Sequence, residues 1–146
     1  MDYAHSYLST SSLQINCDLG EGIPWEKQLF PLIDVASLAC GGHFGTRASL
    51  DASLALATKY GKKVGAHPSY PDQENFGRIS LIIPIETLIE AIGQQIERFK
   101  QRAQAHNLAM DHIKFHGALY NDAAKDSSLA NSLTDFLIEN YPQTPL

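Results

Sequence analysis

Leu13-Gln14-Ile15-Asn16-Cys17-Asp18 alternates apolar and polar residues and ends in a carboxylate. Because neighbouring side chains of a strand point to opposite faces of a sheet, this stretch predicts a strand with one apolar and one polar face. Lys63-Val64-Gly65-Ala66-His67 and His112-Ile113-Lys114-Phe115-His116 repeat the pattern, and both end in histidine. Strands buried on both faces are apolar throughout, so a polar face on three strands favours the interior of a β/α barrel.

Helical patterns separate these strands. Apolar residues recur at helical spacing over residues 47–59, 84–106 and 127–139, and a further short strand is predicted at 34–40. Strands that alternate with helices predict an α/β fold with a parallel sheet and helical crossovers. In such sheets ligands bind beyond the carboxyl ends of the strands, which directs attention to the last residue of each strand.

Length and charge narrow the function classes. The 146 residues suffice for one domain with its own core, predicted over 13–146, and the polar residues 1–12 predict a mobile N-terminal extension without a secretory signal. The net charge is −5 and no Lys/Arg cluster forms a stripe, which argues against nucleic acid and anionic membrane as partners. No apolar run is long enough to span a bilayer. We therefore expect a cytoplasmic protein with a small-molecule substrate.

The two cysteines, Cys17 and Cys40, lie in apolar, strand-like runs. Their spacing does not match a CxxC redox motif, so both are predicted to be buried free thiols in a reducing compartment.

Polar side chains gather where the strands end. They are Asp18, His43, His67, Lys114 and His116. The glycines before His43 allow the backbone to approach a ligand closely. A lysine between two histidines favours a positioned cation for a carbonyl or phosphate oxygen, and Arg78 in the long loop 68–83 is a candidate anion clamp.

Five motifs, in chain order, resemble the signatures of the LamB/YcsF family, whose members form one of the three subunits of 5-oxoprolinase. They are Asn16-Cys17-Asp18-Leu19-Gly20-Glu21, Ala39-Cys40-Gly41-Gly42-His43, Gly65-Ala66-His67-Pro68-Ser69-Tyr70-Pro71-Asp72, Phe76-Gly77-Arg78 and Lys114-Phe115-His116-Gly117-Ala118-Leu119-Tyr120-Asn121. Two positions depart from the family pattern: Thr46 replaces an acidic residue, and Phe115 replaces a proline.

The resemblance implies a parallel β/α barrel of the glycoside hydrolase/deacetylase type, of which this chain has the N-terminal four β/α units. It also implies ATP-dependent opening of 5-oxoproline to L-glutamate, with Mg²⁺ accompanying ATP, together with the partner 5-oxoprolinase subunits B and C. The catalytic candidates are Asp18, Glu21, His67, Lys114 and His116. The substrate-binding candidates are Asn16, His43, Tyr70, Arg78 and Asn121.

Two alternatives remain open. A metal-dependent deacetylase or amidohydrolase, acting on a small amide or a sugar, would use a divalent ion held by Asp18, His43, His67 and His116 to activate water. In the second alternative, the chain is a non-catalytic substrate-binding subunit. Four parallel strands cannot close a barrel, so their open edges also predict a homo-oligomer.

Overall fold

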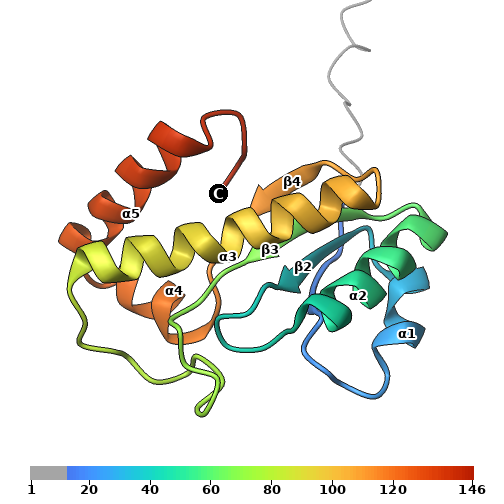
Figure 1. Ribbon diagram of the computed structural model, residues 1–146, viewed down its shortest axis with the longest axis horizontal. Helices are drawn as coiled ribbons and strands as arrows, with labels where there is room; N and C mark the ends of the chain where they lie inside the picture. Colours follow the sequence, from blue (N-terminus) through green and yellow to red (C-terminus); the bar gives the residue numbers. More distant parts are fainter. Residues whose placement is uncertain (1–12) are drawn as a thin grey trace, which may run out of the picture.

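Four parallel strands form one sheet in the order β1-β2-β3-β4 in the computed structural model, which describes residues 13–146 (Figure 1). The strands are β1 (Asn16–Leu19), β2 (Val35–Ala39), β3 (Lys63–His67) and β4 (Met110–Ile113). The helices are α1 (Glu26–Leu29), α2 (Arg47–Tyr60), α3 (Ile85–Ala105), α4 (Gly117–Ala123) and α5 (Ser127–Asn140), with a 3₁₀ turn η1 (Phe30–Leu32). The α/β class and the parallel sheet are confirmed.

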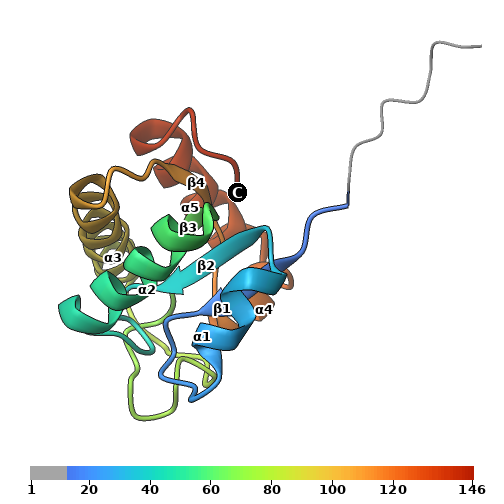
Figure 2. The ribbon, with the colours of Figure 1, turned by 90° about the vertical axis from the view of Figure 1, so that its right-hand side faces the viewer.

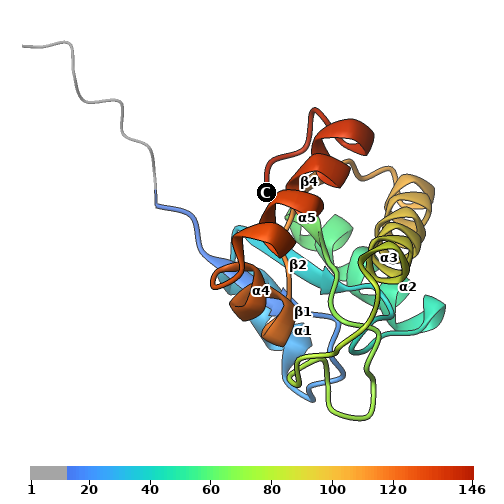
Figure 3. The same cartoon turned by 90° about the vertical axis from the view of Figure 1, so that its left-hand side faces the viewer.

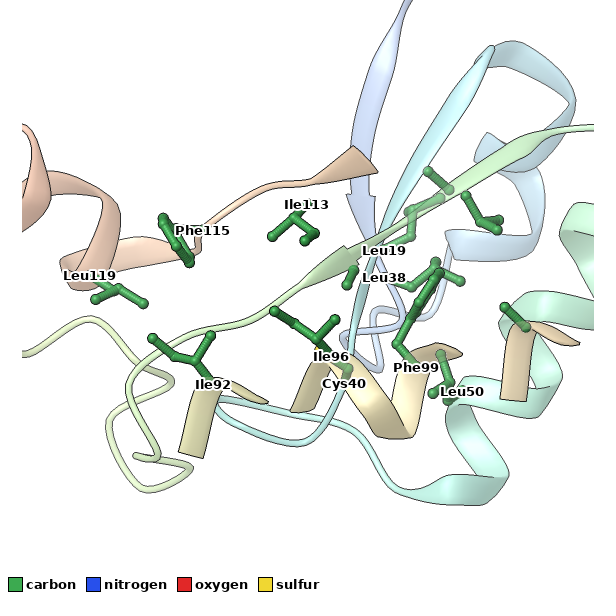
Figure 4. Close-up of a cluster of buried hydrophobic side chains, with 14 of the residues drawn as sticks. Leu19, Leu38, Cys40, Leu50, Ile92, Ile96, Phe99, Ile113, Phe115 and Leu119 are labelled. Atoms are coloured by element: carbon green, nitrogen blue, oxygen red, sulfur yellow. The ribbon is translucent and has the colours of Figure 1, made fainter. Parts of the chain in front are cut away.

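The helices α2 and α3 cover one face of the sheet, and α5 packs beside α3 (Figures 2 and 3). The apolar side chains of the strands meet these helices in a core that includes Leu38, Ile96 and Phe99, all fully buried (Figure 4). Burying large side chains of this kind contributes about 1.5–3 kcal/mol each. This face therefore carries the stability of the domain and leaves the opposite face free for polar groups.

The sheet is strongly curved. Asn16 Nδ2 on β1 lies 3.3 Å from His112 Nε2 on β4, although β2 and β3 lie between these strands. In a flat sheet three strand spacings would separate the two backbones by about 14 Å. Short side chains close this distance only if the sheet curls toward its polar face, as an arc of a barrel does.

Gly65 makes room for this contact. A Cβ atom built on Gly65 would lie 2.3 Å from the ring of His112, which crosses the polar face at that point. Ser37 on β2 completes the group, because its hydroxyl donates to Asn16 Oδ1 at 2.9 Å and contacts His112 Nε2 at 2.8 Å. The polar face predicted from the period-two pattern thus has a hydrogen-bonded layer below the strand ends.

Several predicted boundaries are wrong. The first strand begins at Asn16 and not at Leu13, because Leu13 and Ile15 are largely exposed and do not belong to the core. The last strand is Met110–Ile113 in place of 112–116, and the chain beyond it still runs along β3, since the Lys114 amide donates to the Ala66 carbonyl at 2.9 Å. The two short helices α1 and α4 were not predicted.

The helix predictions agree with the structure to within a few residues. Gly61 ends α2 in the left-handed conformation, with φ 63°, as the sequence suggests. Pro84 lies just before α3 as its N-cap instead of in the first turn. Cys40 is buried, whereas Cys17 is only half-buried, which corrects that prediction, and both thiols are free.

The extension predicted for residues 1–12 lies outside the described residues. Among helices in the described part of the chain, none has the length and apolarity that crossing a membrane requires.

Candidate functional site

Tight glycine turns position the polar groups beyond the ends of the strands. Gly20 and Gly22 have φ of 74° and 75°, so the chain turns sharply after β1 and directs Glu21 toward the strand ends. Gly77 packs under the histidines, because a Cβ there would lie 2.8 Å from His43 Cβ and 3.2 Å from His116 Cδ2. These turns bring together side chains that are far apart in the sequence.

Glu21, His43, His67 and His116 form a buried cluster. His43 Nε2 lies 2.9 Å from Glu21 Oε1, and His116 Nδ1 lies 3.6 Å from the same oxygen. His67 Nε2 and His116 Nδ1 are 3.1 Å apart, and the rings of His43 and His116 stack with their centroids 3.7 Å apart. One ligand atom from each residue lies within 4.8 Å of the others, so the cluster is able to hold a metal ion.

Two of these rings are fixed by the backbone. His67 Nδ1 contacts the carbonyl oxygen of Lys114 at 2.7 Å, and His116 Nε2 contacts that of Phe76 at 3.0 Å. Metal-binding histidines use the second nitrogen in this way, which sets the orientation of the ring.

An ion pair borders the cluster. Lys114 Nζ lies 2.7 Å from Asp18 Oδ1, and Asp18 Oδ2 lies 3.4 Å from His67 Nε2. These three residues line an open cleft of about 370 Å³ together with Asn121 and Tyr120 of α4. A small polar substrate in this cleft would meet a carboxylate, an ammonium group and an imidazole at once.

The pKa values reflect this crowding. Burial tends to raise the pKa of Asp18, but hydrogen bonds and charges from His67 and Lys114 outweigh it and hold the pKa well below its usual value. For Glu21, burial is likewise outweighed by His43, and the pKa is lowered. Burial, reinforced by the charges of His43 and His67, lowers the pKa of His116 to about 4. Asp18 and Glu21 are therefore carboxylates and His116 is a neutral imidazole at neutral pH.

The structure places some predicted site residues elsewhere. Asn16 lies in the Ser37–His112 layer below the strand ends. The hydroxyl of Tyr70 donates to Asp122 Oδ2 at 2.9 Å, and its ring is buried away from the cleft. Arg78 is exposed, with its guanidinium 5.5 Å from the Phe76 ring centroid. The roles proposed for these three residues stay predictions.

Sequence reasoning did not single out Ser37, His112 or the Phe76 carbonyl. The period-two pattern already put His112 on the polar face, which was the available signal. The Phe76 contact depends on a loop in which Phe76 itself has φ 56°, and no sequence pattern predicts that conformation. Glu21 takes the fourth place in the cluster, whereas Asp18, predicted from the sequence as a metal ligand, lies beside it.

Thr46, one of the two departures from the family pattern, has a structural role. Its side chain accepts a hydrogen bond from the Ser49 amide, and the Ser49 hydroxyl lies 2.8 Å from the Thr46 amide, which forms a capping box at the start of α2. An acidic residue at this position would serve as an equally good N-cap.

Comparison with known proteins places these features in a family. The LamB/YcsF family model matches residues 13–146. The crystal structure of a lactam utilization protein from Thermus thermophilus is 32% identical and superposes with a TM-score of 0.86. The match covers 92% of this chain and 56% of that protein, so this chain spans little more than half of its length. The close superposition is consistent with a partial β/α barrel, as predicted. The chain belongs to the LamB/YcsF family.

Proposed function

We propose that this chain takes part in the hydrolytic opening of a small cyclic amide, with 5-oxoproline as the substrate and L-glutamate as the product. The observation that carries the proposal is the Lys114–Asp18–His67 group, which lines a cleft at the strand ends. Support comes from the family and from the structural neighbour, which is named a lactam utilization protein.

The chemistry of the substrate explains why such a group is useful. The carbonyl carbon of an unstrained lactam is a poor electrophile, and water attacks it only when negative charge on the oxygen is stabilised. Lys114 Nζ is the ammonium donor at the cleft, and one well-placed donor of this kind contributes about 3–4 kcal/mol in a transition state. Asp18, the carboxylate that lines the cleft, accepts a proton from the attacking water and returns it to the ring nitrogen as that nitrogen leaves.

ATP with Mg²⁺ would supply the phosphoryl group that turns the lactam oxygen into a leaving group. We assign its binding to the partner subunits B and C. The sequence has no GxxxxGK[ST] loop, and the one lysine that lines the cleft is already paired with Asp18. The described cleft thus offers no cradle for a triphosphate, and we derive no step of this chain through ATP.

The test is ATP-dependent release of glutamate from 5-oxoproline by this chain with candidate subunits B and C, and with each protein omitted in turn. We expect release only when all three are present. Undiminished release without this chain would overturn the proposal. Binding of 5-oxoproline by this chain, combined with turnover by B and C alone, would assign it a supporting, non-catalytic role.

Metal-dependent hydrolysis of an amide is the second candidate function, and the histidine cluster is the observation that favours it. A divalent ion there would activate the amide as a Lewis acid. In the first candidate, phosphorylation by ATP has this activating role. Hydrolysis of a small amide without ATP, abolished by a chelator, is the result that would select this candidate.

A further inference from the structure

The hydrogen bonds of two histidines leave a specific problem at the centre of the buried cluster. A carbonyl oxygen only accepts hydrogen bonds, so the Lys114 carbonyl requires a proton on His67 Nδ1, and the Phe76 carbonyl requires one on His116 Nε2. In the neutral rings the remaining nitrogens, His67 Nε2 and His116 Nδ1, then carry lone pairs. These two lone pairs face each other at 3.1 Å.

Facing lone pairs repel unless something positive lies between them. Glu21 Oε1, a carboxylate oxygen 3.6 Å from His116 Nδ1, adds negative charge to the same space. The side chains concerned are nearly inaccessible: the exposed fractions are 8% for Glu21, 0% for His43 and 1% for His67. Water is therefore a poor source of compensation, and the geometry requires either a shared proton or a bound cation.

The distances fit a metal ion of zinc size. Zinc–nitrogen and zinc–oxygen bonds of about 2.0–2.1 Å set the ligand atoms of a tetrahedral site about 3.3 Å apart. Three contacts within the cluster are 2.9, 3.1 and 3.6 Å, on either side of that value. The other ligand atoms lie within 4.8 Å of one another, and the stacked rings of His43 and His116 must turn relative to each other for both to direct a nitrogen at one ion.

The fourth ligand is His43, whose ring is free to present Nε2. Its Nδ1 is buried without a hydrogen-bond partner among the described residues, so the protein does not fix its tautomer as it does for the other two rings. Nε2 can then donate to Glu21 in the absence of an ion and coordinate when an ion is bound.

We propose that Glu21 Oε1, His43 Nε2, His67 Nε2 and His116 Nδ1 form a binding site for one divalent transition-metal ion of the zinc class. Three imidazoles and one carboxylate suit zinc and its neighbours, whereas Mg²⁺ prefers oxygen ligands. His67 also lines the cleft, so the ion lies beside the space assigned to the substrate. The ion-binding site does not depend on the proposed ring opening or on ATP.

The test is calorimetric titration of the chelator-treated chain with ZnCl₂, together with elemental analysis after dialysis. We expect one zinc per chain, a higher melting temperature with ZnCl₂, and no such rise with millimolar MgCl₂. His116→Gln and Glu21→Gln should weaken zinc binding by at least about 100-fold, since even groups that only orient a ligand contribute 10–100-fold. His106→Gln, a change at a histidine outside the cluster, is the matched control and should bind as the wild type does.

Two results would overturn the proposal. One is zinc binding that His116→Gln and Glu21→Gln leave unchanged while circular dichroism shows both variants folded. The other is absence of zinc uptake by the folded chain. A strongly downfield imidazole proton in the NMR spectrum of that chain would then identify a proton shared between His67 and His116. Neither measurement uses 5-oxoproline or partner subunits. If the zinc-site proposal fails, the proposed ring opening is therefore unaffected.

Discussion

Lys114, which directly follows β4, has its Nζ 2.7 Å from Asp18 Oδ1 on β1 and so links the two edges of the sheet across its concave face. The contact spans 96 residues of sequence and passes over β2 and β3. It is possible only because the sheet curls, and it holds a carboxylate and an ammonium group at the mouth of the cleft. The barrel-like curvature is thus what creates the candidate active site.

Gly65→Ala should destabilise the domain by about 1–3 kcal/mol, because the added methyl group would overlap the His112 ring, which Ser37 holds in place. Urea unfolding followed by circular dichroism measures the loss. The double variant Gly65→Ala/His112→Ala removes the overlap, so the glycine change should cost much less in that background. An equal cost in both backgrounds would show that the ring does not limit space at Gly65.

The sequence predicts the polar face well and the cluster only in part. The predicted bounds of β3 match the observed ones because Gly61 and Pro68 delimit a short alternating run. His67 and Lys114 lie at the same end of the sheet, because β3 and β4 are parallel and their carboxyl ends are adjacent.

The contact between Glu21 and His43 cannot be predicted from the strand pattern. Both residues follow strands through glycine turns with positive φ, and strand periodicity says nothing about where a loop side chain points. Helix α4 was missed for a related reason: it has seven residues and begins at Gly117, a poor helix former with φ 56°. The expected cytoplasmic location, the homo-oligomer and the partner subunits stay predictions.

Thr46→Ala should lower the free energy of unfolding by about 1 kcal/mol, since it removes the side-chain cap of α2. Thr46→Asp, which restores the acidic residue of the family pattern, should stay within about 0.5 kcal/mol of wild type because aspartate also caps and favours a helix N-terminus. Chemical denaturation of the three proteins measures both differences. Equal losses for both variants would mean that capping is not the role of Thr46.

Stability should fall as the pH rises above 10. Burial, with the hydrogen bond to Asp122, raises the pKa of Tyr70 to about 12, so the folded chain keeps a proton that the unfolded chain loses at its ordinary pKa near 10. The stabilisation from the neutral phenol is complete below pH 10 and is lost between pH 10 and about 12. Tyr70→Phe has no proton to lose and should show a shallower decline in urea unfolding between pH 9 and 11. A decline as steep as that of wild type would assign the effect to other groups.

The most direct test of the account is glutamate release from 5-oxoproline by this chain with ATP and subunits B and C, comparing wild type, Asp18→Asn and Lys63→Met. Lys63 forms a similar ion pair, with Asp111 at 3.1 Å, outside the residues lining the cleft, and it serves as the control. Exposed pairs of this kind contribute at most about 1 kcal/mol, so both variants should stay folded. We predict that Asp18→Asn lowers turnover at least about 100-fold, as loss of a catalytic base does, while Lys63→Met keeps most of it. Near-normal turnover by Asp18→Asn would contradict the assignment of the active site to this cleft.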